Sequence, residues 1–213
     1  MKTIFLITTA ITILAINTYG QDNSSNARTK IQLGLKAGAN YSNIYDSKGE
    51  QFDAEGKFGA AAGLFLAIPI GRFFGVQPEI MYSQKGYKQT GSFLGSNYDL
   101  TRTTHYFDIP LLVSIKPVSF LTLQLGPQFS YLMKQKNAFN SALGGVTNEN
   151  EFDNDNIRKN TLGAVVGIDF NFNRIVVGTR ASWDLQNNKG DGTSTNPRYK
   201  NALVQATIGF RLF

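Results

Sequence analysis

The sequence predicts an all-β fold, an eight-stranded antiparallel up-and-down β-barrel. Three observations predict it. Eight segments alternate between apolar residues and polar or small residues, short turns alternate with long polar connections, and glycine is abundant, at 21 of 213 residues. Successive side chains of a strand point to opposite faces, so a period of two indicates a strand with two unlike faces. Short turns at one end and long loops at the other describe a meander that closes on itself.

The first residues have the layout of a secretory signal peptide. Lys2 gives a positive start, an apolar run covers 4–16, and small residues precede the expected cleavage point. This run is shorter than the roughly 20 apolar residues of a membrane-spanning helix. A retained anchor or a buried N-terminal strand is the alternative. We expect a signal peptide at 1–20, a flexible polar lead-in at 21–30 and the barrel at 31–213.

Eight apolar rows define the predicted strands, and their connections alternate in length. The rows run from Ile31 to Tyr41, Phe58 to Ile68, Phe74 to Tyr82, Phe107 to Ile115, Leu121 to Met133, Leu162 to Phe172, Ile175 to Leu185 and Ala202 to Leu212. Tight turns are expected at 69–72, 116–119 and 171–174, and long polar loops around 45–56, 88–103, 136–158 and 188–200. An even number of strands places both ends of the barrel at the short-turn side.

The apolar face is predicted to meet lipid. A soluble barrel of the lipocalin kind, with its apolar face around a ligand, is the alternative. Against it, the other face is rich in Gly and Ala, which a narrow eight-stranded lumen requires. Aromatic residues also stand near the loop end of the apolar face, as in the aromatic girdle of an outer-membrane barrel. The expected girdle consists of Tyr41, Phe58, Tyr82, Phe107, Tyr131 and Trp183.

The opposite parity gathers four acidic and four basic residues in the predicted lumen. They are Lys36, Glu79, Lys85, Asp108, Asp169, Arg180, Asp184 and Arg211. Buried charges persist when they are paired and hydrogen-bonded. We therefore expect a salt-bridged network that fills the lumen, with Arg180 and Arg211 forked onto carboxylates such as Glu79 or Asp169. A selective ion path is the alternative.

Composition excludes several kinds of chemistry. The chain has no Cys, one His and a net charge of +6 without a Lys/Arg block. A thiol nucleophile, a cysteine metal site and a polyhistidine site are thereby excluded, and no cofactor, metal or nucleic-acid partner is expected. His105 is the one candidate acid–base residue, at the rim beside Gln84, Lys88 and Gln135, and no Ser stands at a spacing that pairs with it. A rim-located lipid-modifying enzyme is the low-ranking alternative.

Three prolines, Pro78, Pro110 and Pro127, fall inside predicted strands. Proline cannot donate a ladder hydrogen bond, and a closed barrel has no edge strand to hold it. Bulges or a local widening of the barrel at these positions would explain them.

Three segments carry a family resemblance. They read GLKAGANYS at 34–42, GVQPEIMYSQKG at 75–86 and YFDIPLL at 106–112. Together they resemble the PorT-like outer-membrane β-barrel proteins of Bacteroidetes-type bacteria, across 31–213. The resemblance implies a barrel of the Gram-negative outer membrane, and it explains the in-strand prolines as family features. The founding member is linked to type IX protein secretion, whereas most members have no assigned biochemical function.

The sequence therefore predicts a non-enzymatic protein of the bacterial outer membrane, with short periplasmic turns and four long extracellular loops. Loops on a rigid scaffold commonly carry binding. The expected role is structural or one of surface interaction, through the loops at 88–103 and 136–158. An accessory component of a type IX-like secretion apparatus is the alternative. The expected partners are outer-membrane lipid and a protein at the loops or in a secretion complex.

Overall fold

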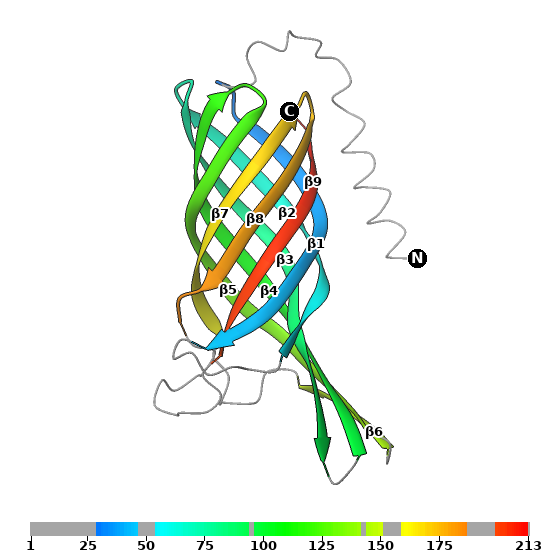
Figure 1. Cartoon of the computed structure of the whole chain (residues 1–213). Coiled ribbons are helices and arrows are strands. Elements are labelled where there is room, and N and C mark those ends of the chain that lie inside the picture. Colours follow the sequence, from blue (N-terminus) through cyan, green and yellow to red (C-terminus); the bar gives the residue numbers. More distant parts are fainter. Residues whose placement is uncertain are drawn as a thin grey trace, which may run out of the picture.

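Eight antiparallel strands form a closed ring, as Figure 1 shows for the computed structural model. The structure describes residues 29–46, 54–93, 96–141, 144–150, 159–186 and 199–212. The predicted signal peptide and most of the lead-in lie outside these residues. The strands are β1 (Gln32–Asp46), β2 (Ala54–Ile70), β3 (Phe74–Phe93), β4 (Ser96–Val118), β5 (Leu121–Ser141), β6 (Gly144–Asn150), β7 (Asn160–Phe172), β8 (Ile175–Asp184) and β9 (Tyr199–Arg211).

The order around the ring is β4-β3-β2-β1-β9-β8-β7-β5, and pairing between β4 and β5 closes it. β6 pairs only with β5 among the described strands, so it lies outside the ring. Pairing is antiparallel throughout, which a meander with hairpin connections requires. The predicted fold class is confirmed.

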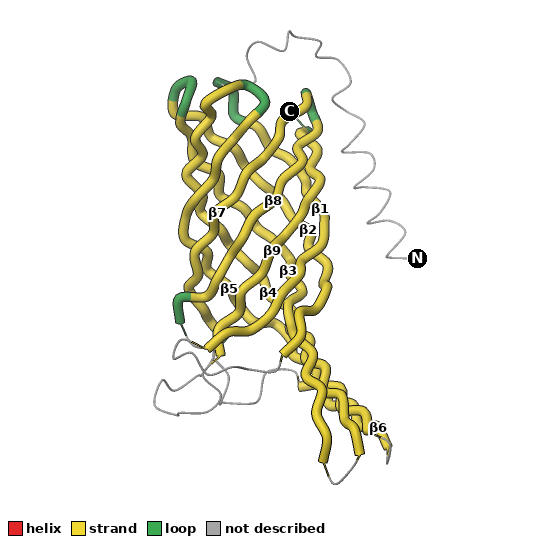
Figure 2. Tube along the Cα trace, in the orientation of Figure 1, coloured by secondary structure: helices red, strands yellow, loops and turns green. Residues whose placement is uncertain are grey.

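Tight turns join the strands at one end of the barrel, here the turn end (Figure 2). Gly71 and Asn173 occupy two of these turns with positive backbone angles, φ 78° and φ 50°. Gly and Asn tolerate this region better than other residues, so they fit tight hairpins. β1 starts and β9 ends at the same end, as an even number of ring strands dictates. The opposite end is called the loop end.

Several strands run further than the sequence predicted. The expected loop at 88–103 is mostly a hairpin, because β3 continues to Phe93 and β4 begins at Ser96. Part of the expected loop at 136–158 is also strand, in the end of β5 and in β6. We name the resulting four-stranded extension the projecting sheet: residues 87–93, 96–103 and 135–141, and β6. It extends beyond the barrel wall in Figure 1.

The three prolines do not mark shifts of register. The pairing before and after Pro78, Pro110 and Pro127 keeps one register, although Cα pairs beside each proline are missing from one ladder. A missing N–H therefore interrupts the hydrogen bonds without inserting a residue. The shifts lie elsewhere, between Gly56 and Ala61 and between His105 and Tyr106, with a third near the turn after β4. The proposed bulges at the prolines were wrong.

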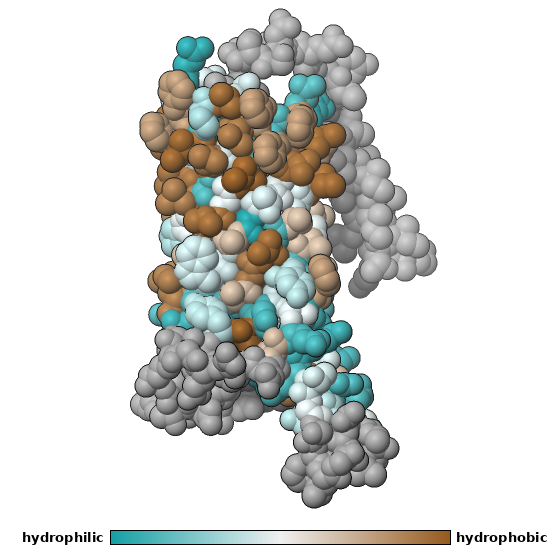
Figure 3. Space-filling view, viewed as in Figure 1, coloured by the Kyte–Doolittle hydropathy of each residue, from teal (hydrophilic) through white to brown (hydrophobic). Residues whose placement is uncertain are grey.

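The outer surface is apolar and the lumen is polar. Figure 3 shows a broad apolar surface toward the turn end, and the exposed large residues include Ile80, Leu125 and Ile208. Tyr82 lies eight residues after Phe74 on β3. At about 3.4 Å per residue and a strand tilt of about 40°, this segment spans roughly 20 Å along the barrel axis. This approaches the apolar height of about 25 Å typical of outer-membrane barrels. Within the described residues, no helix is long and apolar enough to cross a bilayer.

Candidate functional site

A three-membered ion cluster occupies the lumen toward the turn end. Lys36 Nζ lies 2.6 Å from Glu79 Oε1, and Arg180 donates to both oxygens of Glu79, Nη1 at 2.7 Å and Nη2 at 3.2 Å. The three side chains come from β1, β3 and β8, and all three residues are buried. Gln77 Nε2 adds a hydrogen bond of 2.8 Å to Glu79. The carboxylate is thus held from three strands, as a buried charge requires.

The cluster extends across the lumen to Asp169. Arg180 Nη2 donates to Gln124 Oε1 at 3.0 Å, and Gln124 Nε2 donates to Asp169 Oδ2 at 2.8 Å. Gly178 makes room for this carboxylate, because a Cβ at that position would lie 2.4 Å from Asp169 Oδ1. At this position the glycine on the lumen parity therefore has a local cause, the space taken by the buried side chain of Asp169.

A second cluster lies toward the loop end. Lys85 Nζ is 3.0 Å from Asp108 Oδ1 and 3.4 Å from Ser130 Oγ. Asp184 stands nearer the rim, where Oδ2 accepts hydrogen bonds from the side chain and the backbone of Asn201, at 2.6 and 3.2 Å. The eight charges predicted for the lumen thus fall into separate groups instead of one continuous network.

A small cavity separates the two ion clusters. Its volume is about 10 Å³, and its lining includes Asp108, Gln128, Arg180, Ser182 and Gln205. This is room for about one water molecule. Arg180 Nε and Gln205 Oε1 have no protein partner among the described residues, so a water molecule here would have groups to bind. The lumen is filled by side chains at this level.

Arg211 was expected to fork onto a carboxylate, and it does not. Its guanidinium donates to the Asn173 carbonyl oxygen at 2.8 Å and to the side-chain oxygen of Asn171. Arg211 lies at the last turn-end position of β9, where it is only half-buried. It binds the β7–β8 turn, whereas Arg180, in the middle of β8, reaches Glu79.

Two lumen aromatics escaped the sequence analysis. Phe65 is 3% exposed and its ring lies 5.0 Å from Lys36 Nζ, while Tyr106 is 2% exposed and its ring lies 4.5 Å from Lys85 Nζ. Each ammonium therefore has an aromatic face beside its carboxylate partner. Both residues share the parity of the lumen charges, so the alternation in the sequence indicates their position in the lumen.

The six residues proposed for the aromatic girdle lie on the outer face near the loop end. Tyr82, Phe107 and Tyr131 stand side by side across β3, β4 and β5 as register partners. Tyr41 and Phe58 pair in the same way across β1 and β2, with ring centroids 5.0 Å apart. Trp183 stands alone of the six on β8, opposite Ala164 and Ala202.

The turn end carries an aromatic set that the sequence analysis missed. One or two exposed phenylalanines lie at each tight turn. They are Phe73 and Phe74, Phe120, and Phe172, with Phe210 close to the last turn. A signal for them existed in the sequence, because every predicted tight turn has a Phe within two residues of it.

His105 contacts an aromatic hydroxyl on the outer face of the barrel wall. Its Nδ1 lies 2.5 Å from Tyr82 Oη, on the outer face at the edge of the aromatic set. Its register partners are Gln84 on β3, as predicted, and Lys134 on β5, where Gln135 was expected. The difference arises because β5 carries one extra residue between Leu132 and Lys134. The nearby Ser83 and Ser130 are buried on the lumen side of the wall, opposite to His105.

One face of the projecting sheet gathers aromatic side chains and an arginine. Tyr98 and Phe139 stack with centroids 5.6 Å apart, and Phe139 is 40% exposed. Next to them, Arg102 lies 5.6 Å from the ring of Tyr87 and donates through Nε to Asn137 Oδ1 at 2.9 Å. Stacking, cation–π contact and a hydrogen bond hold this face in one arrangement.

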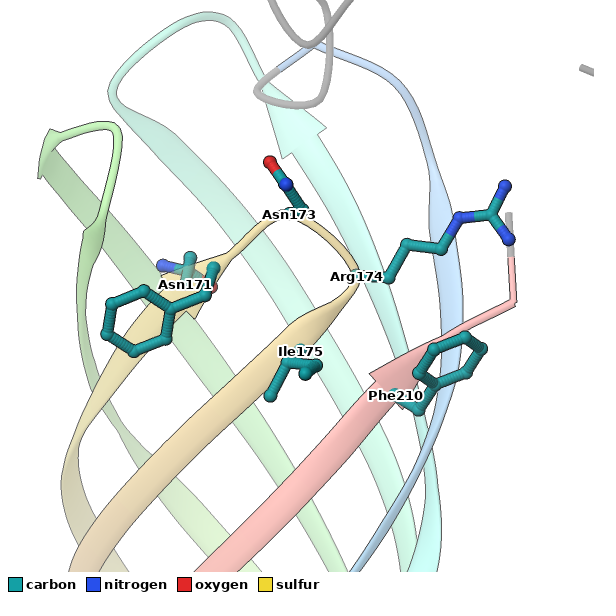
Figure 4. A pocket seen from close by; sticks show the side chains of 6 residues that line it. Asn171, Asn173, Arg174, Ile175 and Phe210 are labelled. Atoms are coloured by element: carbon teal, nitrogen blue, oxygen red, sulfur yellow. The ribbon is translucent and has the colours of Figure 1, made fainter. Parts of the chain in front are cut away.

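An open depression of about 790 Å³ lies at the β7–β8 turn. Figure 4 shows the side chains that line it. Asn171, Asn173, Arg174, Ile175 and Phe210 contribute to its lining, together with Phe172. Arg174 is the one ionisable residue of these six, so the depression offers no acid–base pair. It belongs to the turn-end surface.

The match to a known protein family agrees with this architecture. A family model described as "Outer membrane protein beta-barrel domain" matches residues 19–190. No curated protein matches the chain.

Among solved structures, Ail of Yersinia pestis is 12% identical, with a TM-score of 0.47, over 86% of this chain and 99% of that one. Neisserial surface protein A is 12% identical, with a TM-score of 0.49, over 84% and 96%. OprG from Pseudomonas aeruginosa is 11% identical, with a TM-score of 0.42, over 86% and 97%.

The family match shows that the barrel lies in the bacterial outer membrane. Short turns then face the periplasm and the loop end faces the outside, as in outer-membrane barrels generally. The outward apolar face meets lipid, and the polar lumen lies within the wall. By the match over 19–190, the chain belongs to the outer membrane protein beta-barrel domain family and is a protein of the bacterial outer membrane.

Proposed function

We propose that this protein is a non-enzymatic surface-interaction barrel that binds a protein partner through the projecting sheet. The observation that carries the proposal is the face formed by Tyr98, Arg102 and Phe139. Tyr, Phe and Arg are enriched at protein interfaces, and residues already held in place lose little entropy on binding. Stacking at 5.6 Å and the hydrogen bond from Arg102 to Asn137 supply that order.

The position of this face suits a binding role. It stands beyond the aromatic residues Phe107 and Tyr131, on strands that extend outward from the barrel wall. A hydrogen-bonded sheet holds side chains more firmly than an irregular loop would, because backbone pairing fixes their spacing. The barrel then serves as the membrane anchor of a rigid recognition element.

The lumen and the girdle have structural roles in this proposal. The eight charges, in their separate groups, fill and stabilise the inside of the barrel, and the six loop-end aromatic residues hold its depth in the bilayer. An interior of eight strands is just wide enough for side chains to fill. The residues 1–20 would direct export as a cleaved signal peptide.

Photo-crosslinking at a single position tests the partner. A photoreactive residue replaces Phe139 on intact cells, and a matched one replaces Ala60 on the lipid-facing surface of β2. We expect a discrete protein adduct from position 139 that is absent from position 60, and its loss when Tyr98→Ser is added. Identical adducts from both positions, or none from position 139, would contradict a binding face there.

An accessory role in a type IX-like secretion apparatus is the alternative. Its support is the PorT-like resemblance of 34–42, 75–86 and 106–112. These segments form barrel wall in β1, β3 and β4, so they explain the fold more directly than they explain secretion. Deletion of the gene with measurement of cargo at the cell surface distinguishes the two, because a surface binder leaves export intact.

A further inference from the structure

The turn end of the barrel is basic throughout its described part. None of the described turn-end segments contains Asp or Glu; these segments are 29–35, 68–76, 114–122, 170–176 and 209–212. Their basic residues are Lys30, Arg72, Lys116, Arg174 and Arg211. Asp169, which adjoins one of these segments, is buried in the lumen. A surface of one charge sign at this end suits an anionic partner.

Arg174 is an exposed member of this basic set, at the β7–β8 turn. Its backbone carbonyl oxygen accepts a hydrogen bond of 2.7 Å from the N–H of Arg211. Its guanidinium has no hydrogen-bond or ion-pair partner among the residues that the structure describes. Because a guanidinium presents its N–H donors as a planar fork, it can bind a phosphate group through two of them.

An apolar row lies directly beside Arg174 on the outer face of the wall. Phe172, Ile175 and Phe210, here the β8 row, are successive register partners across β7, β8 and β9, and all three are exposed. They line the depression of about 790 Å³ together with Arg174. In Figure 4 the Arg174 side chain extends from the turn toward the end of β9, where Phe210 lies. The depression thus joins an apolar surface to one cation, within the usual size range of ligand sites.

The β8 row marks the periplasmic boundary of the apolar surface. Trp183, at the loop end, lies eight residues after Ile175 on β8, the same spacing as that of Tyr82 and Phe74 on β3. Arg174 is one residue beyond this boundary. A basic residue at such a level lies near the lipid phosphates, while the apolar residues beside it meet the acyl chains.

The same arrangement recurs at the β2–β3 turn. Ile70, Phe74 and Ile115, here the β3 row, are register partners across β2, β3 and β4. Arg72 lies in the adjoining turn, is exposed, and has no side-chain partner among the described residues. Since β3 and β8 are four strands apart in the ring of eight, the two arginines lie on opposite sides of the barrel.

We infer that the depression at the β7–β8 turn binds a phospholipid of the periplasmic leaflet, with its phosphate on the Arg174 guanidinium and its acyl chains along the β8 row. Arg72 and the β3 row form a second site of the same kind. Both sites lie at the opposite end of the barrel from the projecting sheet, so they are independent of the proposed protein partner.

The test measures binding of phosphatidylglycerol to the purified full-length barrel by native mass spectrometry. Diacylglycerol with the same acyl chains is the probe that lacks the phosphate. The variants are Arg174→Gln alone and Arg72→Gln with Arg174→Gln. The matched control is Lys88→Gln with Lys200→Gln, which removes two positive charges at the loop end. Heat-modifiable gel migration first shows that each protein is folded.

We expect the double arginine variant to bind the first and the second phosphatidylglycerol about fivefold more weakly, the usual contribution of one basic residue at an anionic lipid surface. Arg174→Gln alone should weaken mainly the second lipid and leave the first within about twofold, because the Arg72 site remains. The control should stay within about twofold for both lipids. Diacylglycerol should bind the wild type and the double variant equally.

Equal binding of phosphatidylglycerol by the double arginine variant and the control would overturn the inference. So would wild-type binding of diacylglycerol as strong as that of phosphatidylglycerol. Displacement of the lipid by inorganic phosphate at low concentration would assign the site to the free anion, and self-association through this end without lipid uptake would assign it to a second copy. If the glutamine variant fails to fold, Arg72→Lys with Arg174→Lys should keep most of the binding, and wild-type binding must fall as salt is raised.

Discussion

The guanidinium of Arg180 donates hydrogen bonds to both carboxylate oxygens of Glu79 across the lumen. Arg180 lies on β8 and Glu79 on β3, two strands that are not neighbours in the ring. Lys36 binds the same carboxylate from a third strand at 2.6 Å. One acid is thus shared by two bases, and all three side chains are shielded from solvent. Removal of any member leaves charge in the lumen without its partner.

Glu79→Gln should destabilise the barrel by about 3–5 kcal/mol, because two buried cations lose their shared counter-charge. The measurement is the urea midpoint of heat-modifiable gel migration in lipid vesicles. Glu55→Gln, at an exposed glutamate on the rim of β2, is the control and should change the midpoint little.

The combined variant Lys36→Leu, Glu79→Leu, Arg180→Leu and Asp169→Asn should be much less destabilised than Glu79→Gln. It removes the buried charges of the cluster together, including that of Asp169, whose cationic neighbours are Lys36 and Arg180. An equal loss in both proteins would show that hydrogen-bonded shape, and not charge balance, holds the lumen.

Planar-bilayer recordings should show no steady ion current through the wild-type barrel. The cavity between the ion clusters has a volume of about 10 Å³, too small for a continuous water column. Replacing Lys36, Glu79 and Arg180 together by Ala should open a measurable conductance in the molecules that fold. A steady wild-type current of defined size would instead make the lumen an ion path.

Gly38→Ala should weaken the seam between β1 and β9. A Cβ at Gly38 would lie 1.9 Å from the Ala206 carbonyl oxygen, so the backbone must move, at a cost of about 1–3 kcal/mol. Gly209→Ala, whose nearest contact would be 3.1 Å, is the matched control on the same seam. The urea midpoints of the two variants should differ in that order, and the reverse order would contradict the close approach at Gly38.

His105→Ala should leave the lipid A mass spectrum of the cells unchanged. The geometry around His105 offers Tyr82 and Lys134, and the nearby Ser83 and Ser130 face the lumen. A nucleophile, a base and an orienting group must meet on one face for hydrolysis or acyl transfer. Lipid species that disappear in His105→Ala and return with the wild-type gene would restore the enzyme hypothesis.

The period of two was sufficient to find the barrel wall. Lys36, Glu79 and Arg180 were assigned to the lumen from parity alone, because lipid on one side and a narrow interior on the other impose unlike residues on alternate positions. The same rule failed beyond the rim. There both faces of a strand meet water, so no continuous apolar row is required. The segment around Tyr98 is mostly polar, with only Tyr98 and Leu100 apolar or aromatic, and it was predicted to be a loop.

The alternation of residues in the sequence could not predict which lumen side chains contact one another. Parity states which face a residue occupies, whereas contact across the ring depends on tilt, stagger and local shifts of register. The single extra residue in β5 before Lys134 is enough to change the neighbour of His105. For the same reason Arg211 was expected at a carboxylate and is found at Asn171 and Asn173.

The Glu79–Arg180 contact joins residues 101 positions apart, and the hydrogen bond from Gln205 to Asn40 joins residues 165 apart. Neither contact can form until nearly all of the strands have been inserted into the barrel wall. These contacts therefore stabilise the barrel only in the last steps of its assembly. Proteins dominated by such non-local contacts fold slowly. Until the ring closes, the inward-facing charged side chains need water or a chaperone around them. Closure of the ring removes this water from the interior and makes the barrel resistant to unfolding.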